Sequence, residues 1–505
     1  MSARRTLVVP LLFIVAVGAG LRLYELSRNP PEFFEDEVAA ASSAWSIATT
    51  GHDVEQTTLP FVRTRLLLQQ PVYAFSVVPF WAVLGHTPFA ARLPGFVFGI
   101  AGVLLIVWLI TVLGRPPGEA LLAGSIAAVL PWAVHIGRIG WDQASPVPFV
   151  VAGVGLLWVG LRDERRAYLL AGAAVLGVGV YTYLPAVFMN CLLAGVVVLI
   201  HRDKVHAQIK SLVRAASVGV VLLIPYAVAL RQPIFTARAK KISVFASGVN
   251  LAALHKIWTY YWWQWTLKGL FSPASNNLRD KPGAMVFWWM LPFLLIGIVD
   301  LARRRSKSDQ LLLAWLVVGP LPAALTYDGP VPHFSRGMWT MPAVVMVTAA
   351  GVVAAARFVG VGRYARVSRA VLAATIAAAA LYQGVVYYRE YFDLRRGYAA
   401  RSASWWYYGT GAALRAVRAE AEAGDVACID GISYFTFAHH ITYYFGPHPA
   451  FTVLEGLKDN RCRQAGTYVL ARTGQGLGAP YRELKLIRGY DGAPVFRLAL
   501  IEPSA

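Results

Sequence analysis

Charged residues are scarce in this chain. Asp, Glu, Lys and Arg make up 15% of its 505 residues, whereas a soluble globular protein carries about 25%. Apolar residues make up 57%, and they stand in repeated runs of about 20, the length that crosses a bilayer. The composition therefore excludes an ordinary soluble enzyme and predicts a membrane protein with many spans.

Cysteine is also scarce, with three residues in the chain. Three are too few for a disulfide-rich scaffold or a cysteine metal cage. Cys191 lies in an apolar segment, where we expect a small buried side chain. Cys428 and Cys462 both lie in the polar C-terminal region, and a disulfide between them is possible if that region is extracytoplasmic.

The chain lacks a glycine-rich phosphate loop that would hold a nucleotide. Its net charge of +20 would suit nucleic acid, but the Lys and Arg residues stand in short clusters between apolar segments rather than in one patch. Such clusters are what the positive-inside rule predicts for cytoplasmic loops. We therefore expect no nucleic-acid partner.

The apolar segments and the basic clusters together predict the topology. The segment 71–85 is short for a span, and we interpret it as interfacial or re-entrant. About eleven transmembrane helices then remain, at 6–26, 93–113, 119–137, 146–161, 167–184, 186–200, 212–230, 284–302, 310–326, 342–357 and 369–388. The connections thereby placed in the cytoplasm are all basic, as the rule requires: Arg115; Arg162, Arg165 and Arg166; Arg202, Lys204 and Lys210; Arg303, Arg304, Arg305 and Lys307; and Arg357, Arg363 and Arg366. The N-terminus is predicted to be cytoplasmic and the C-terminus extracytoplasmic.

The tail loses the long apolar runs. Segments 426–429, 468–470 and 495–500 are predicted strands, and 414–423 is a predicted helix. The predicted fold is therefore mainly α: a polytopic helix bundle over 1–388, followed by a small extracytoplasmic α/β domain over 389–505.

The first outer loop, 27–92, holds the main candidate for chemistry. Asp36 and Glu37 stand at the head of an Ala/Ser-rich segment that we expect to be helical. Asp36 could be a helix N-cap. It could instead be a general base, which contributes about 10²–10⁴-fold to a reaction in which a hydroxyl or amine attacks a sugar carbon.

Several short motifs follow one another in a specific order. They are Leu21-Arg22-Leu23, Asp36-Glu37, Gln70-Pro71-Val72-Tyr73, Ala91-Arg92-Leu93-Pro94, Leu130-Pro131-Trp132, Gly137-Arg138-Ile139-Gly140-Trp141-Asp142, Tyr181-Thr182-Tyr183-Leu184-Pro185 and His333-Phe334-Ser335-Arg336. This order resembles the lipid-linked-sugar glycosyltransferases of the GT-C fold, above all the protein O-mannosyltransferases and the bacterial aminoarabinose transferases.

The resemblance implies a GT-C membrane enzyme that moves one monosaccharide from a polyprenyl-phosphate donor to an acceptor, by an inverting displacement on the outer face of the bacterial cytoplasmic membrane. It implies that Asp36 is the base and that Glu37, Arg92, Arg138 and Asp142 support catalysis. Arg138 and Asp142 could instead form a local pair four residues apart on a helix.

Further residues are candidates for holding the donor phosphate. Arg238 and Lys241 lie in the outer segment 231–283, and Arg336 lies in a short outer loop near His333, which is a weaker candidate. Guanidinium groups suit bidentate phosphate contacts. Tyr183 could donate to phosphate, or it could belong to the aromatic belt at the membrane interface.

Two departures from the family pattern concern the substrates and a metal. Gln69 and Gln70 stand where aminoarabinose transferases carry an acid–base pair, which leaves donor and acceptor open. Asp142 is followed by Gln143, not by the second acid of metal-dependent oligosaccharyltransferases, and hard cations need several oxygen ligands. We therefore expect a metal-independent mechanism, with no firm cofactor prediction, although Asp36 and Asp142 could share a divalent cation. The tail residues His439, His440 and His448 lack ligand spacing and are interpreted as surface histidines.

A rival interpretation is a lipid or sugar-lipid flippase. Such a transporter needs ionisable groups along a path through the membrane, whereas the predicted spans are nearly uncharged at their centres. A second rival is an assembly protein whose tail binds partners. The pattern favours chemistry at the outer surface.

Overall fold

The computed structural model describes residues 2–56, 61–63, 68–234, 240, 243–271, 283–326, 334–403, 406, 408–432 and 436–503. The chain forms two compact units. Residues 1–24 and 94–389 make up the helical unit, and residues 25–93 and 390–505 make up the α/β unit.

The helical unit consists of apolar helices joined by short turns. Its elements are α1 (Ser2–Leu23), α4 (Pro88–Val112, which begins in the other unit), α5 (Pro117–Val129), α6 (Pro131–Ile136), η1 (Asp142–Ala144), α7 (Pro146–Arg162), α8 (Arg166–Gly179), α9 (Ala186–Ile200), α10 (Arg202–Ala229), α12 (Leu251–Trp263), α13 (Leu267–Phe271), α14 (Met290–Arg304), α15 (Lys307–Val318), α16 (Leu321–Ala324), η2 (Arg336–Thr340), α17 (Met341–Val359) and α18 (Ala365–Phe392).

Each segment predicted to span the membrane contains a helix, although α14 begins only at Met290 within the predicted span 284–302. Two of the segments are broken. The predicted span 119–137 divides into α5 and α6 before Pro131, and 310–326 divides into α15 and α16 near Pro320. Proline lacks an N–H group and cannot continue the hydrogen-bond ladder of a helix. Within the described residues, five helices are long and apolar enough to cross a membrane, and several shorter apolar helices accompany them. The chain is a multipass membrane protein, while the number of spans stays a prediction.

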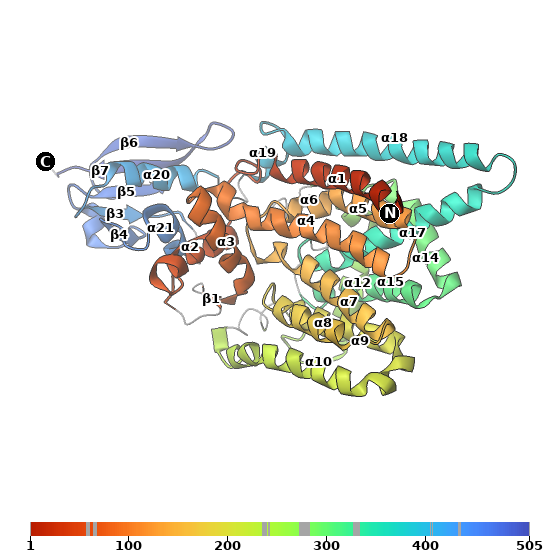
Figure 1. The fold of residues 1–505 in the computed structure, drawn as a ribbon. Coiled ribbons are helices and arrows are strands. Elements are labelled where there is room, and N and C mark those ends of the chain that lie inside the picture. The colour runs from red at the N-terminus through yellow and green to blue at the C-terminus, as the bar shows by residue number, and fades with distance from the viewer. Residues whose placement is uncertain are drawn as a thin grey trace. The chain divides into compact units, whose positions relative to one another are not determined.

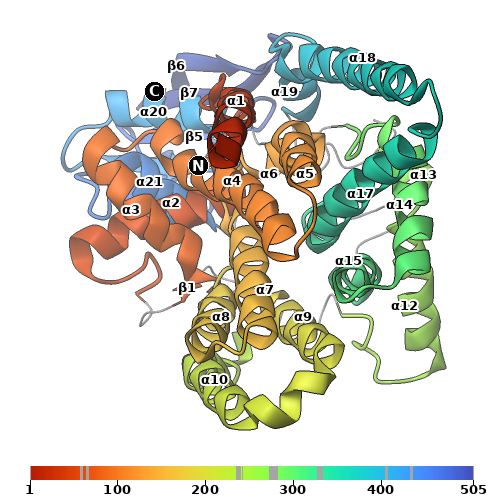
Figure 2. The ribbon, with the colours of Figure 1, turned by 45° about the vertical axis from the view of Figure 1, so that its right-hand side comes forward.

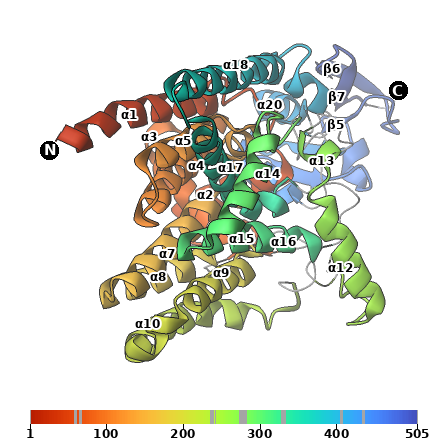
Figure 3. The ribbon, with the colours of Figure 1, turned by 90° about the vertical axis from the view of Figure 1, so that its right-hand side faces the viewer.

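Close helix packing holds this unit together. Helices α7, α8, α9 and α10 lie together (Figure 2), and α14, α15 and α17 form another group (Figure 3). A Cβ atom on Gly297 of α14 would lie 2.1 Å from the Val347 carbonyl oxygen, and one on Gly351 of α17 would lie 1.8 Å from that of Phe293. Only glycine lets these two backbones approach so closely, as is typical of membrane helix pairs.

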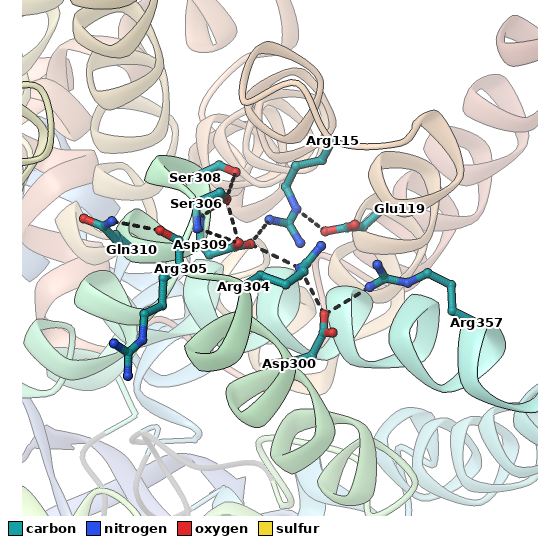
Figure 4. Close-up of polar contacts among 10 residues, drawn as sticks. All are labelled: Arg115, Glu119, Asp300, Arg304, Arg305, Ser306, Ser308, Asp309, Gln310 and Arg357. Atoms are coloured by element: carbon teal, nitrogen blue, oxygen red, sulfur yellow. Dashed lines mark hydrogen bonds and ion pairs between the residues drawn. The ribbon is translucent and has the colours of Figure 1, made fainter.

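Ion pairs join the connections that were predicted to be cytoplasmic. Arg115 binds Glu119 and Asp309, while Arg304 and Arg357 both bind Asp300 (Figure 4). Two further pairs link Lys204 to Glu164 and Lys307 to Asp203. The five basic connections are thereby linked into one network at a single end of the helical unit.

The α/β unit combines the first predicted outer loop with the tail. Its elements are α2 (Glu35–Thr50), β1 (Val62–Arg63), β2 (Leu68–Gln69), α3 (Pro71–Leu84), α19 (Tyr398–Ser402), α20 (Thr410–Glu420), β3 (Val426–Ile429), α21 (Phe437–Phe445), β4 (Thr452–Glu455), η4 (Asn460–Arg463), β5 (Tyr468–Arg472), β6 (Tyr481–Arg488) and β7 (Pro494–Ile501). The five-stranded sheet has the order β4-β3-β5-β7-β6 (Figure 1). The strands β3, β4 and β5 are parallel, and β7 is antiparallel to both β5 and β6.

The tail agrees in part with the sequence prediction. Three predicted strands and the predicted helix occur as β3, β5, β7 and α20, whereas β4, β6 and α21 were not predicted. Cys428 and Cys462 form a disulfide with a Cα–Cα distance of 5.7 Å, so the pairing left open by the sequence is present. Cys191 was predicted to be buried, and this is wrong: it is exposed on α9.

The first loop and the tail pack against each other inside this unit. Helix α2 contacts α3 and also α21 of the tail. The domain boundary was predicted between residues 388 and 389, and the second chain segment of the helical unit ends at residue 389. Residues 25–93, which were predicted to belong to the membrane domain, pack with the tail instead. The 14-residue α3 covers the short apolar segment that we interpreted as interfacial.

Candidate active site

Helix α2 carries the acidic pair at its N-terminus. The helix begins at Glu35, and its N-cap is Phe34. The interpretation of Asp36 as an N-cap is therefore wrong, because Asp36 is the second residue of the helix. Glu37 satisfies a terminal donor instead, since its Oε2 accepts from the Phe34 N–H at 3.2 Å.

Glu37 and Arg92 form a fully buried ion pair. Arg92 Nε donates to Glu37 Oε1 at 2.9 Å, and Nη2 donates to Oε2 at 2.9 Å. The two side chains are 1% and 0% exposed. This two-point contact fixes the first turn of α2 relative to the start of α4.

Arg92 also binds the loop that precedes α2. Nη1 donates to the carbonyl oxygens of Leu26, at 2.9 Å, and Pro30, at 2.8 Å. Nη2 donates to that of Glu32 at 2.8 Å. With the two bonds to Glu37, these contacts use all five N–H donors of the guanidinium group. Arg92 therefore acts as the organising centre of the segment 26–37.

Asp36 remains half-exposed beside this clamp. Gln69 Nε2 donates to Asp36 Oδ1 at 2.8 Å, so a side chain from β2 orients the carboxylate. The N-terminus of α2 stabilises negative charge at this position. The next residue, Gln70, is 2% exposed, and neither its amide nitrogen nor its amide oxygen has a hydrogen-bond partner among the described residues.

Aromatic residues of the tail pack against residues 26–37, which we call the acidic loop. Phe33 lies edge-to-face on Tyr443, with ring centroids 5.0 Å apart, and Phe34 meets Trp406 at 5.9 Å. The side-chain amide of Asn29 donates to the Tyr391 carbonyl oxygen at 2.7 Å. The tail is therefore part of the structure that positions α2.

The tail histidines His439 and His440 were predicted to be surface residues, and this is wrong: their side chains are buried, at 0% and 2% exposure. His439 Nε2 donates to the Arg63 carbonyl oxygen at 2.9 Å. Because a carbonyl can only accept, Nδ1 is the acceptor for the Ser42 hydroxyl at 2.8 Å. Burial lowers the pKa of His439 to about 3 and that of His440 to about 4. His448 is exposed, as predicted.

In the helical unit, Arg138 binds the end of α1. Its Nη1 donates to the carbonyl oxygens of Leu21, at 2.8 Å, and Arg22, at 2.9 Å. The prediction of a pair on one helix with Asp142 is wrong in its premise, since α6 ends at Ile136 and η1 begins only at Asp142. Arg138 serves instead as a C-terminal cap for α1.

Arg22 caps the C-terminal end of α5, where the predicted span 119–137 is interrupted. Pro131 has no N–H for the Ala127 carbonyl, and the Trp132 N–H donates to Met285. Arg22 Nη2 donates to the Ala127 carbonyl oxygen at 3.3 Å, and Nη1 to that of Ala128 at 2.8 Å. Arg22 was named from the sequence only as part of a motif. The sequence feature that pointed to its capping role was Pro131, which interrupts the helix.

Asp142 and Tyr183 lie close to the same turn. Gln143 Nε2 donates to the Tyr183 hydroxyl at 3.4 Å. Ser145 Oγ donates to the carbonyl oxygens of Asp142, at 2.7 Å, and Thr182, at 3.3 Å. The structure thereby brings together two of the predicted residues, one before α7 and one after α8.

Arg336 is 6% exposed at the start of η2. The predicted phosphate ligands Arg238 and Lys241 lie outside the described residues, as does His333. Within the described part of the chain, no group of three or more His, Cys, Asp or Glu side chains is placed to hold a metal ion.

The family described as dolichyl-phosphate-mannose-protein mannosyltransferase matches residues 69–228. No curated protein shows significant sequence similarity to the chain.

Several solved structures share the fold over most of this chain. Apo ArnT from Cupriavidus metallidurans is 13% identical, with a TM-score of 0.60 over 96% of this chain and 97% of that one. The same protein bound to undecaprenyl phosphate is 14% identical, with a TM-score of 0.58 over the same shares of the two chains. The apo oligosaccharyltransferase of Archaeoglobus fulgidus is 12% identical, with a TM-score of 0.58 over 92% of this chain and 69% of that one. The chain therefore has the GT-C fold, as the resemblance in its sequence implied.

Proposed function

We propose that this protein is a membrane glycosyltransferase that takes a monosaccharide from a polyprenyl-phosphate donor, with Asp36 as its general base. The observation that carries the proposal is the arrangement around α2. Glu37 is engaged in a buried ion pair with Arg92, whereas Asp36 is half-exposed and is oriented by Gln69. The similar ArnT was solved with undecaprenyl phosphate, which supports a lipid phosphate as the donor's leaving group.

The reaction is a single displacement. The acceptor hydroxyl or amine attacks the anomeric carbon, its proton passes to the Asp36 carboxylate, and the bond from that carbon to the phosphate oxygen breaks. Polyprenyl phosphate leaves with the bonding electrons, and the anomeric configuration inverts. Arg336 and Tyr183 remain proposed phosphate ligands in the helical unit, and Arg138 and Asp142 remain proposed to support catalysis.

The buried amide of Gln70 adds a second argument for a substrate near this loop. A buried polar group without a partner costs about 1–3 kcal/mol, and a ligand that supplies a donor and an acceptor removes that cost. Gln70 immediately follows the residue that orients Asp36.

The disulfide and the ion pairs support catalysis on the outer face. Disulfides persist in oxidising compartments, and Cys428–Cys462 lies in the same unit as Asp36. The five basic connections lie together at one end of the helical unit, and the positive-inside rule predicts that this end faces the cytoplasm. We therefore place the α/β unit outside the cytoplasmic membrane of a bacterium.

The test is transfer from synthetic, radiolabelled polyprenyl-phosphate monosaccharides by purified protein, with release of free sugar also measured. Asp36→Asn should reduce both rates by about 10²–10⁴-fold. Glu35→Gln, a charge change one residue earlier in the same helix turn, is the matched control and should keep its activity. Equal activity of Asp36→Asn and wild type would refute the assignment of the base. A folded protein that binds lipid but turns over no donor would refute the enzyme and favour a flippase.

A further inference from the structure

A second site lies in the α/β unit, in a part of the chain with no predicted function. A cavity of about 390 Å³ is bordered by α19, Tyr408, the start of α20, the end of β5 and the β6–β7 hairpin. Its volume falls within the range of small-molecule sites, about 300–1,000 Å³. The side chains that give it chemical character are Tyr408, Thr410, Arg472, Tyr490, Asp491 and Phe496.

The guanidinium group of Arg472 lies over the Phe496 ring on one side of the cavity. It lies 5.4 Å from the centroid of the Phe496 ring, and its Nη2 donates to the Gly431 carbonyl oxygen at 3.2 Å. Gly431 has a φ of +79°, and a Cβ there would lie 2.8 Å from Arg472 Cγ and 3.3 Å from the Phe496 ring. The glycine thus leaves room for the arginine, which is exposed and keeps further N–H donors for a ligand.

The hairpin between β6 and β7 provides a further part of the lining. Asp491 Oδ1 accepts from the Ala493 N–H at 3.0 Å, and the Gly489 N–H donates to the Ala493 carbonyl oxygen at 2.6 Å. The Tyr490 ring lies edge-to-face on Tyr408, with centroids 4.8 Å apart, and both rings are half-buried. The turn therefore presents an aromatic ring and a carboxylate side by side.

This combination selects one class of ligand. An anion such as phosphate would be attracted by Arg472 but repelled by Asp491. A lipid chain would need a continuous apolar lining. A neutral sugar ring has hydroxyl groups that both donate and accept, together with C–H faces that pack on aromatic rings.

We propose that this cavity binds a neutral sugar unit of the acceptor, so that the acceptor is itself a glycan or glycoconjugate. The inference rests on the proposed function, since it names the class of acceptor. Tyr408 and Tyr490 provide the packing surface, and Arg472 and Asp491 bind the hydroxyl groups.

The experiment is saturation-transfer NMR on the full-length protein in detergent micelles. The ligands are methyl hexosides, methyl pentosides and their disaccharides, with the matching sugar phosphates and inorganic phosphate as the anionic arm. The variants are Tyr490→Ala and Asp491→Asn; the asparagine keeps the Oδ1 acceptor of the turn. Lys485→Gln, an exposed charge change on β6, is the matched control.

A neutral saccharide should bind the wild type, the control and the Asp36→Asn variant equally. Its affinity should fall at least about tenfold in both cavity variants. Binding of none of the neutral ligands, preference for the phosphates, or equal binding by the cavity variants would each overturn the proposal. Because this experiment measures binding without turnover, its outcome does not depend on transferase activity. A failure of the transferase proposal can therefore be distinguished from a failure of the binding proposal.

Discussion

The ion pair between Glu37 and Arg92 gives the sharpest test of how the acidic loop is held. Glu37→Gln would leave the Arg92 charge buried without an anion, since the two side chains are 0% and 1% exposed. Removal of one partner from a buried pair costs about 3–5 kcal/mol. The expected loss is a large part of the stability of a typical domain, which is about 5–15 kcal/mol.

Arg92→Lys should be nearly as damaging although the charge is kept. The guanidinium group serves five oxygen positions: two on Glu37 and the carbonyls of Leu26, Pro30 and Glu32. An ammonium group has three donors, so at least two of these oxygens lose their partner. Each buried acceptor left unsatisfied costs about 1–3 kcal/mol.

The measurement combines thermal unfolding in detergent with steady-state kinetics well below the unfolding temperature. Both variants should unfold at a lower temperature, and kcat should fall while KM for the donor changes little, because the loop positions the proposed base. The control is Arg28→Gln, which removes an exposed pair with Glu25 in the same loop. Exposed pairs contribute about 0–1 kcal/mol, so this variant should resemble the wild type.

The double variant Glu37→Leu/Arg92→Met completes a mutant cycle. It should be less destabilised than the sum of its single changes, because no unpaired charge remains. Additive effects, or single variants no less stable than Arg28→Gln, would refute the view that this pair organises the loop.

Three further predictions concern the rest of the chain. The low pKa of His439, about 3 against an ordinary 6.5, means that the unfolded chain binds more protons between these values. Unfolding free energy should therefore fall below pH 6.5, by at most about 1.4 kcal/mol per pH unit, and thermal melts of His439→Gln should depend less on pH; an unchanged slope would contradict this. Arg22→Met should lower the unfolding temperature in detergent by leaving helix-end carbonyls unsatisfied, each at about 1–3 kcal/mol, and a wild-type melting curve would show that water or lipid satisfies them. Replacing Cys428 and Cys462 by Ala should cost about 2–5 kcal/mol and make the tail sensitive to proteolysis; resistance equal to that of the wild type would show that the disulfide adds no stability.

The helices of the membrane part were predictable because burial in lipid demands long apolar runs with satisfied backbones. Every predicted segment contains a helix, and a proline lies at each break, although the breaks themselves were not predicted. The aromatic and glycine contacts between helices were not predictable, since they depend on which faces meet. The close approach of Gly297 to Val347, for example, joins residues 50 positions apart.

The tail was harder to predict because its periodicity is weak. Strand β6 is an edge strand with mostly exposed residues, so it lacks the alternation that identifies a strand. Helix α21 contains several β-branched and aromatic residues, which have modest helix propensity, and it is stabilised by packing on α2. The burial of His439 follows from that packing, which no pattern within the tail reveals.

Three of the four motif arginines show why the site was only partly predictable. Arg22, Arg92 and Arg138 all donate to backbone carbonyls, at a broken helix, a loop and a helix end. Guanidinium offers five donors in a planar fork and stays charged, so it suits backbone that leaves regular helix within a membrane protein. A motif built on such residues reports the fold as strongly as the reaction. The proposed function assigns the chemistry to a motif residue that the fold leaves half-exposed, and within the acidic loop Asp36, oriented by Gln69, is such a residue.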